Sequence, residues 1–146
     1  MAERIEAFKK DHLDECAQLL MVTFNTEPWN DKWTLDRAKK ALAWTLRVPG
    51  FVGLVTLDDG VAGFATGYRE PDDVRDVFYL NTFCVKPDVQ GRGVGSRLLE
   101  HLKAHLEESG VNTIHLITSR GTPAEAFYKK NGYTVNSKDI VMTCEW

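Results

Sequence analysis

A glycine-rich segment past the middle of the chain has the residue types and spacing of a phosphate-binding turn. Gly91, Gly93 and Gly95 stand between an apolar segment, 78–85, and an amphipathic segment, 98–106. A strand that runs through such a turn into a helix directs backbone N–H groups outward, and the helix dipole adds partial positive charge there. Glycine also lets a ligand approach the backbone closely. The segment therefore predicts a pocket for the diphosphate of a nucleotide-like cofactor.

Two other phosphate-binding motifs do not fit this segment. A dinucleotide fingerprint requires Gly-x-Gly-x-x-Gly, usually at the first strand-helix turn of its domain. Counting from Gly91 puts the third glycine at Ser96, and counting from Gly93 puts it at Leu98. A P-loop ends in Gly-Lys-Ser or Gly-Lys-Thr, and the segment has neither. A nucleotide-binding regulatory domain is therefore the weaker interpretation.

A second segment, 122–131, predicts a short helix. Thr122 is a candidate N-cap, the following proline suits the first helical position, and an Asn-Gly pair ends the helix. Ala124, Phe127 and Tyr128 are three and four residues apart and so share one face. Small Ala124 would let a ligand approach, while Tyr128 would project a phenol toward it.

These two segments together resemble the GCN5-related N-acetyltransferase (GNAT) family. The spacing Gln90-x-x-Gly93-x-Gly95 is similar to the family signature Gln/Arg-x-x-Gly-x-Gly/Ala, whose loop binds the pyrophosphate of acetyl-coenzyme A. The segment 123–133 resembles the family's later signature, and the strand that ends at Val85-Lys86-Pro87 resembles its pantetheine-binding strand. The resemblance covers 78–133 and is looser over 1–77. It implies an α/β (α+β) fold with a mixed central sheet, splayed fourth and fifth strands and helices on both faces.

The resemblance also implies roles for particular residues. The loop 90–96 would hold the pyrophosphate, residues 83–85 the pantetheine arm, and Tyr128 would act as general acid toward the leaving thiolate. The alternative for Tyr128 is a half-buried helix aromatic. The expected acetyl-coenzyme A ligands are Phe83, Cys84, Val85, Gln90, Gly91, Arg92, Gly93, Val94, Gly95, Ser96, Ser119, Ala124, Phe127 and Tyr128.

The chain departs from many relatives at the position of the general base. Where they carry a glutamate four residues before the pantetheine-binding valine, this chain has Asn81, which cannot take a proton. Strand alternation predicts that residues 81, 83 and 85 share one face, so Asn81 would position the amine or a relaying water. Other carboxylates remain open as bases, each with a solvated-surface alternative: Glu27, Asp31, Glu70, Asp72, Asp73 and Asp76. A second departure is Gly121, where many relatives have an asparagine that contacts the cofactor; Ser119 or Thr122 would supply that contact, or it is missing.

An aromatic and acidic stretch between the first two helices is the candidate border of the acceptor site. Trp29 and Trp33 could recruit a cationic amine by cation–π attraction, or they could instead close the core under a long loop. The expected acceptor contacts are Glu27, Trp29, Asn30, Trp33, Asn81 and Thr82. Trp44 and Trp146 are expected to be packing residues. Cys84 would suit an acyl-cysteine intermediate, but a buried apolar role is the preferred interpretation.

Composition bounds the class of protein. The 146 residues suffice for one domain, 1–146, and a net charge of −3 gives no reason to expect nucleic acid as a partner. We expect no membrane association, because no apolar run approaches the roughly 20 residues of a membrane helix and the first ten residues lack a signal-peptide core. Three cysteines without paired spacing suggest neither a disulfide framework nor a metal site, and a cytoplasmic location fits best.

Apolar periodicity and turn residues predict an alternating order of elements. Strands are expected at 3–8, 51–57, 61–68, 77–86, 111–118, 132–136 and 139–146, and helices at 11–24, 35–46, 94–109 and 122–131. This order is that of the family fold.

The function expected from the sequence is direct transfer of acetyl from acetyl-coenzyme A to a primary amine within a ternary complex. A small amine such as an aminoglycoside or polyamine is the preferred acceptor. The alternatives are a protein N-terminal or lysine acetyltransferase, and a non-catalytic coenzyme A-binding regulatory domain. A homodimer is possible.

Overall fold

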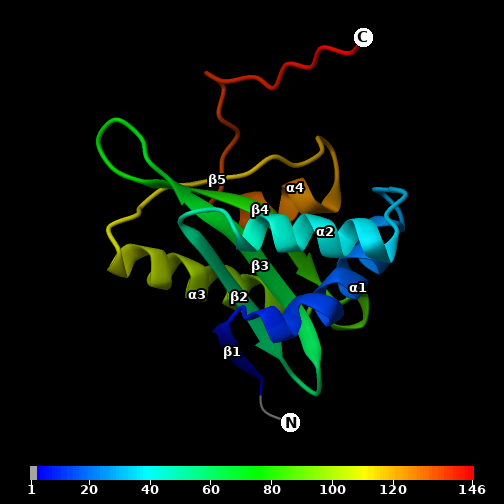
Figure 1. Ribbon diagram of the computed structural model, residues 1–146. Coiled ribbons are helices and arrows are strands. Elements are labelled where there is room, and N and C mark those ends of the chain that lie inside the picture. Colours follow the sequence, from blue (N-terminus) through cyan, green and yellow to red (C-terminus); the bar gives the residue numbers. More distant parts are fainter. Residues whose placement is uncertain (1–2) are drawn as a thin grey trace.

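The structure is a computed structural model that describes residues 3–146, and its framework is a mixed sheet of five strands (Figure 1). The strands lie side by side in chain order: β1 (Arg4–Ala7), β2 (Phe51–Leu57), β3 (Val61–Glu70), β4 (Val77–Val85) and β5 (Ile114–His115). The first four pair antiparallel and β5 pairs parallel to β4. The mixed sheet expected from the sequence is therefore confirmed.

Helices cover both faces of this sheet, as expected. One face carries α1 (Leu13–Phe24) and α2 (Leu35–Leu46), which bury Leu20 and Leu42 against Phe64 of β3. The other face carries α3 (Val94–Glu108) and α4 (Pro123–Lys130), and there Leu98 and Leu102 pack against Phe78. Figure 1 shows α1 and α2 in front of the sheet and α3 behind it.

The predicted helix boundaries agree with the structure because local capping decides them. The Thr34 hydroxyl accepts a hydrogen bond from the Arg37 N–H at 3.1 Å, and the Thr122 hydroxyl accepts one from the Glu125 N–H at 3.3 Å. Gly132 follows α4 with a φ of 92°, which glycine adopts without strain. The helix expected over 11–24 begins instead as a short 3₁₀ helix, Lys10–His12, that continues into α1.

The last part of the chain differs from the prediction. The strand expected over 111–118 is limited to Ile114–His115, and the strands expected over 132–136 and 139–146 do not form. After Tyr133 the chain leaves the sheet and turns at Asn136, whose side chain bonds the N–H of Lys138 (Figure 1). An apolar run becomes a strand only where it pairs and packs, and this one does neither. Its large apolar side chains are exposed: Val135, Ile140, Val141, Met142 and Trp146.

A β-bulge in β4 reverses the strand alternation next to the predicted site. Thr66 of β3 pairs with Thr82 but Gly67 pairs with Leu80, which leaves Asn81 as the extra residue. The prediction that residues 81, 83 and 85 share one face is therefore wrong. Phe83 packs with the α3 and α4 layer, whereas Asn81 bonds to α2 on the opposite face.

Candidate active site

The centre of the candidate site is an unpaired stretch of β4. The parallel pairing with β5 involves only Phe78 and Tyr79, opposite Ile114 and His115, and then the two strands diverge. Beyond this point, β4 runs on to Val85 and no strand within residues 3–146 pairs with its β5 side. The splay expected between the fourth and fifth strands is present, and it exposes backbone donors and acceptors to which an extended ligand could bond.

Aromatic side chains from β4 and α4 pack at this opening. The Phe83 and Phe127 rings stack with centroids 5.6 Å apart, and the Tyr128 ring lies 6.0 Å from Phe83 and 5.4 Å from Tyr133. Gly95 at the start of α3 adjoins this cluster. The structure thus brings Phe83, Gly95, Phe127 and Tyr128 together, four of the residues expected around the cofactor.

The glycine-rich loop ends at a helix start that offers free N–H groups. Gly91 and Gly93 have φ values of 84° and 82°, and Gly93 is the N-cap of α3. Because glycine has no capping side chain, the N–H groups of the first turn of α3 remain free for an anion. Gln90 does not extend outward: its Nε2 donates to the Val85 carbonyl oxygen at 2.9 Å and closes the loop onto β4.

Arg97 supports the same loop, a role that sequence reasoning missed. Its Nη1 donates to the Arg92 carbonyl oxygen at 3.2 Å, and its Nε and Nη2 donate to the two carboxylate oxygens of Glu3, each at 2.8 Å. The Arg97 bond also holds the pKa of the Glu3 carboxyl below its ordinary value. Because 94 positions separate Glu3 from Arg97, no local signal could have revealed the pair.

Burial raises the pKa values of Tyr128 and Cys84, the two side chains considered above for acid and covalent chemistry. It raises the pKa of the Tyr128 phenol above its ordinary value, with smaller contributions from Tyr133 and Cys84, so that this hydroxyl stays protonated at neutral pH. It also raises the pKa of the Cys84 thiol to about 12. Cys84 is buried in the core beneath α1, and its thiol donates to the Leu19 carbonyl oxygen at 3.8 Å. An inert buried thiol is the interpretation that the structure supports.

Asn81 lies on the α2 side of the opening and is exposed. Its Nδ2 donates to the Thr45 hydroxyl oxygen of α2 at 3.0 Å. Tyr68 and Tyr79 lie on the same face of the sheet, with ring centroids 5.6 Å apart. Neither Thr45 nor the tyrosine pair could be predicted from the sequence. Thr45 is 36 positions from Asn81, and the tyrosines meet only through the register of β3 against β4.

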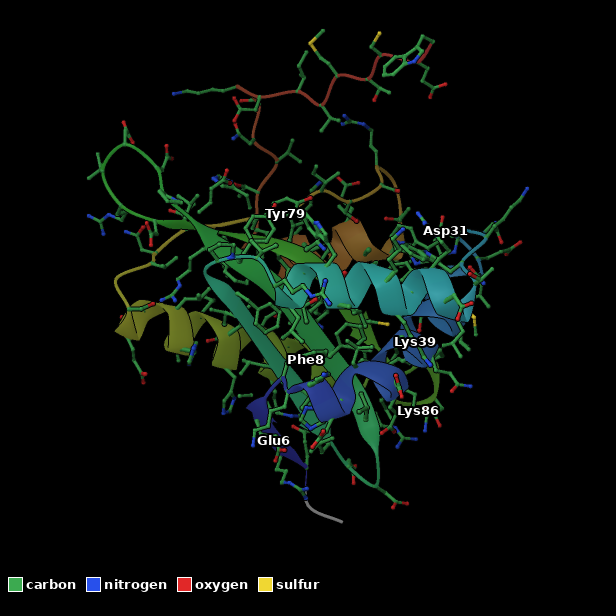
Figure 2. The ribbon with its side chains drawn as sticks, in the orientation of Figure 1. Glu6, Phe8, Asp31, Lys39, Tyr79 and Lys86 are labelled. Atoms are coloured by element: carbon green, nitrogen blue, oxygen red, sulfur yellow. The ribbon has the colours of Figure 1, made fainter. Side chains whose placement is uncertain are left out.

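The tryptophan segment lies at the other end of α2. Trp29 packs on Phe24 with centroids 5.5 Å apart, and the Trp33 Nε1 donates to Asp31 at 3.1 Å. Figure 2 shows Asp31 near the start of α2 and Tyr79 near its opposite end. Ten residues of helix between Leu35 and Thr45 correspond to about 15 Å. The structure therefore does not bring Trp33 or Asp31 to Asn81, while Glu27 and Asn30 are exposed in the same segment.

Two tryptophans behave differently from the prediction. Trp44 is 61% exposed and Trp146 is fully exposed, so the expectation that both are packing residues is wrong.

At the position of the missing asparagine, Gly121 has a φ of 76° and its N–H donates a hydrogen bond to Glu125. The Thr122 hydroxyl already donates to the Ser119 carbonyl oxygen and accepts from Glu125, which leaves the exposed Ser119 as the candidate for that contact.

Within residues 3–146, no three His, Cys, Asp or Glu side chains gather closely enough to hold a metal ion. No helix in the same range is both long and apolar enough to cross a membrane.

Comparison with known proteins decides the family. The model of the acetyltransferase (GNAT) family matches residues 13–133. The chain belongs to this family. Acetyl-coenzyme A is the cofactor that GNAT acetyltransferases use, so the cofactor and enzyme class expected from the loop are those of the family.

Individual GNAT relatives differ in what they acetylate. The chain is 32% identical over 109 residues to a [ribosomal protein bS18]-alanine N-acetyltransferase of Salmonella typhimurium, a match that covers 69% of this chain and 71% of the relative. It is 27% identical over 140 residues to a mycothiol acetyltransferase of Propionibacterium freudenreichii, with 94% of this chain but only 45% of that protein covered. The chain thus spans less than half the length of that relative.

The fold is also that of solved acetyltransferases. The aminoglycoside N-acetyltransferase AAC(6′)-Iy in complex with CoA superimposes with a TM-score of 0.79, over 99% of this chain and 96% of that one, at 18% identity. At this identity the likeness shows the GNAT fold alone.

Proposed function

We propose that this GNAT chain transfers acetyl from acetyl-coenzyme A directly to a primary amine within a ternary complex. The observation that carries the proposal is the meeting of three features at one opening. These are the unpaired edge of β4, the free N–H groups at the start of α3, and the protonated Tyr128 of α4. A thioester cofactor needs all three, for its pantetheine arm, its pyrophosphate and its leaving sulfur.

The cofactor would lie across the splay. Its pyrophosphate would take the N–H groups of residues 90–96, with Arg92 exposed at the loop and Ser96 in the first turn of α3. The pantetheine amides would pair with β4 over residues 83–85 as an added strand does. Ala124 and Phe127 of α4 would form the other wall.

The chemistry is nucleophilic substitution at the thioester carbon. The neutral amine nitrogen attacks this carbon, and a backbone N–H of β4 near Val85 stabilises the negative charge that develops on the carbonyl oxygen. The carbon–sulfur bond then breaks, and the Tyr128 hydroxyl gives its proton to the departing thiolate. The proton that the amine nitrogen loses passes through water and restores the Tyr128 hydroxyl, because Asn81 cannot accept it.

The acceptor we propose is a small cationic amine such as an aminoglycoside or polyamine. Asn81, Thr82 and the Tyr68–Tyr79 pair would surround the amine on the α2 side. Aromatic faces attract such cations. The Trp29–Trp33 segment would meet only the distal part of a long acceptor, since α2 separates it from Asn81.

A protein N-terminus is the second candidate acceptor. The similarity to the alanine N-acetyltransferase of Salmonella typhimurium favours it, because that match covers 71% of the relative. The open surface around Asn81 is compatible with a peptide as well as with a small amine.

A homodimer and a cytoplasmic location are part of the proposal. The exposed apolar side chains after Tyr133 supply surface for association between two copies. The free thiols of Cys16, Cys84 and Cys144 suit a reducing compartment.

The test begins with calorimetric titration of acetyl-coenzyme A into the protein. Thiol release is then followed with spermidine, sisomicin, 2,4-diaminobutyrate and a peptide that begins with alanine. Binding with thiol release in the presence of a small amine supports the proposal, and release with the peptide alone would favour the second candidate. Binding without release from any amine would indicate a non-catalytic coenzyme A-binding domain. Absence of binding would overturn the assignment of the loop.

A further inference from the structure

The side chain of Asn81 is held in one orientation by a buried threonine. Asn81 is the extra residue of the β4 bulge, and its Nδ2 donates to the Thr45 Oγ1 at 3.0 Å. Thr45 is fully buried between α2 and the sheet, whereas Asn81 is exposed. Thr45 is therefore the immobile partner, and it fixes the orientation of the exposed Asn81 side chain.

The threonine also determines which end of the amide is presented. Its hydroxyl has a single hydrogen, and this hydrogen is donated to the Ala41 carbonyl oxygen of α2 at 3.1 Å. The Thr45 oxygen can then only accept, so it selects the NH₂ group of Asn81 over the carbonyl oxygen. The Asn81 Oδ1 takes no part in this bond and remains a hydrogen-bond acceptor.

A second pair of polar residues, Thr66 and Thr82, lies beside the bulge. Thr66 is 1% exposed, stands opposite Thr82 on the neighbouring strand, and its hydroxyl makes no hydrogen bond within residues 3–146. Thr45, Thr56 and Thr66 are the only buried polar side chains in that range, and two of them flank the bulge. A buried hydroxyl without a hydrogen-bond partner, such as that of Thr66, lowers stability.

We infer that Thr45 is a positioning residue for the acceptor: it fixes the Asn81 amide with Oδ1 toward the amine. This inference rests on the proposed function. The Oδ1 accepts a hydrogen bond from an N–H of the neutral amine and so directs the nitrogen lone pair toward the thioester carbon. A rotated amide would present N–H groups instead, which would donate to the nitrogen lone pair and so occupy the electrons needed for attack.

The experiment compares Thr45→Val, which removes the hydroxyl while keeping the shape, with Thr45→Ser, which keeps the hydroxyl. The acceptor is the amine from the panel above that gives the fastest thiol release. Loss of one neutral hydrogen bond corresponds to a fall of about fivefold in kcat/KM for the amine. Thr45→Ser should retain most of the activity. The Kd for acetyl-coenzyme A should stay within about twofold in both variants, because neither touches the β4 edge or the loop.

A double-mutant cycle with Asn81→Ala separates positioning from general packing. Asn81 is exposed, so its replacement leaves the core intact. If Thr45 acts through Asn81, Thr45→Val should cost nothing further in the Asn81→Ala background. Equal losses in both backgrounds, or equal activity of Thr45→Val and wild type, would overturn the inference while leaving the proposed function standing. An inactive wild type would overturn the proposed function, and the inference with it.

Discussion

Gly95 lies against Phe127 so closely that a Cβ at position 95 would stand 2.9 Å from the Phe127 Cζ. The same Cβ would lie 3.4 Å from the Phe83 Cζ. Phe127 cannot simply swing away, because its ring stacks on Phe83 with an interplanar angle of 23°. Gly95, the third glycine of the loop, thus allows α3 to contact α4 closely, in addition to giving a ligand access to the backbone.

The first prediction concerns this contact. Gly95→Ala should lower the free energy of unfolding by about 1–3 kcal/mol, since overpacking outweighs the gain in helix propensity. The matched control is the double variant Gly95→Ala with Phe127→Leu, in which the smaller side chain makes room for the methyl group. Urea denaturation measures both. If Gly95→Ala were as stable as wild type, the close contact would not exist in solution.

The second prediction concerns the anion site at the start of α3. Gly93→Asp should abolish detectable binding of acetyl-coenzyme A in calorimetry, because the new carboxylate would face the pyrophosphate with like charge. Gly110→Asp is the matched control. Gly110 also has a positive φ, 85°, but it follows the other end of α3 and has open space around it. The two variants suffer similar backbone strain, and they differ in that a Cβ at position 93 would also lie 2.8 Å from the Arg97 Nη1. Equal affinity in both would place the pyrophosphate elsewhere.

The third prediction concerns the general acid. Tyr128→Phe should lower kcat by about 10²-fold or more while the Kd for acetyl-coenzyme A changes little. The aromatic packing with Phe83 and Tyr133 is retained, because only the hydroxyl is removed. Tyr133→Phe, in the neighbouring ring, serves as the control and should keep wild-type turnover. A fall in cofactor affinity without a fall in turnover of the bound enzyme would exclude the acid role.

Features that depend on neighbouring residues could be predicted from the sequence. Three predictions rest on short segments: the cap of α4, the glycine-rich turn and the resemblance over 78–133. The family resemblance also predicted that β4 and β5 splay apart, and their short pairing confirms this prediction.

Features that depend on distant residues could not be predicted. The bulge at Asn81 is defined only by the register of β3 against β4, so strand alternation gave the wrong face. The Asn81–Thr45 bond joins residues 36 positions apart, which no periodicity reports. The strands expected over 132–136 and 139–146 failed for a related reason, since an apolar pattern does not specify a pairing partner.

The last prediction concerns alkaline stability and follows from the buried hydroxyl of Tyr133. Burial, with a smaller contribution from Glu100, raises its pKa to about 12, against about 10 for a free tyrosine. Below pH 10 the phenol is protonated in both the folded and unfolded states, and the full stability is present. Between about pH 10 and 12 the unfolded state loses the proton first, so the free energy of unfolding falls by at most about 1.4 kcal/mol per pH unit.

Tyr133→Phe should remove this group's share of the alkaline loss. The Tyr133 hydroxyl is buried and makes no hydrogen bond within residues 3–146, so its deletion should be neutral or slightly stabilising near pH 8. The gap between variant and wild type should then widen in favour of the variant as the pH approaches 11. Urea denaturation at a series of pH values measures this gap. Parallel losses of stability in the two proteins would show that the Tyr133 phenol ionises as readily in the folded state as in the unfolded chain.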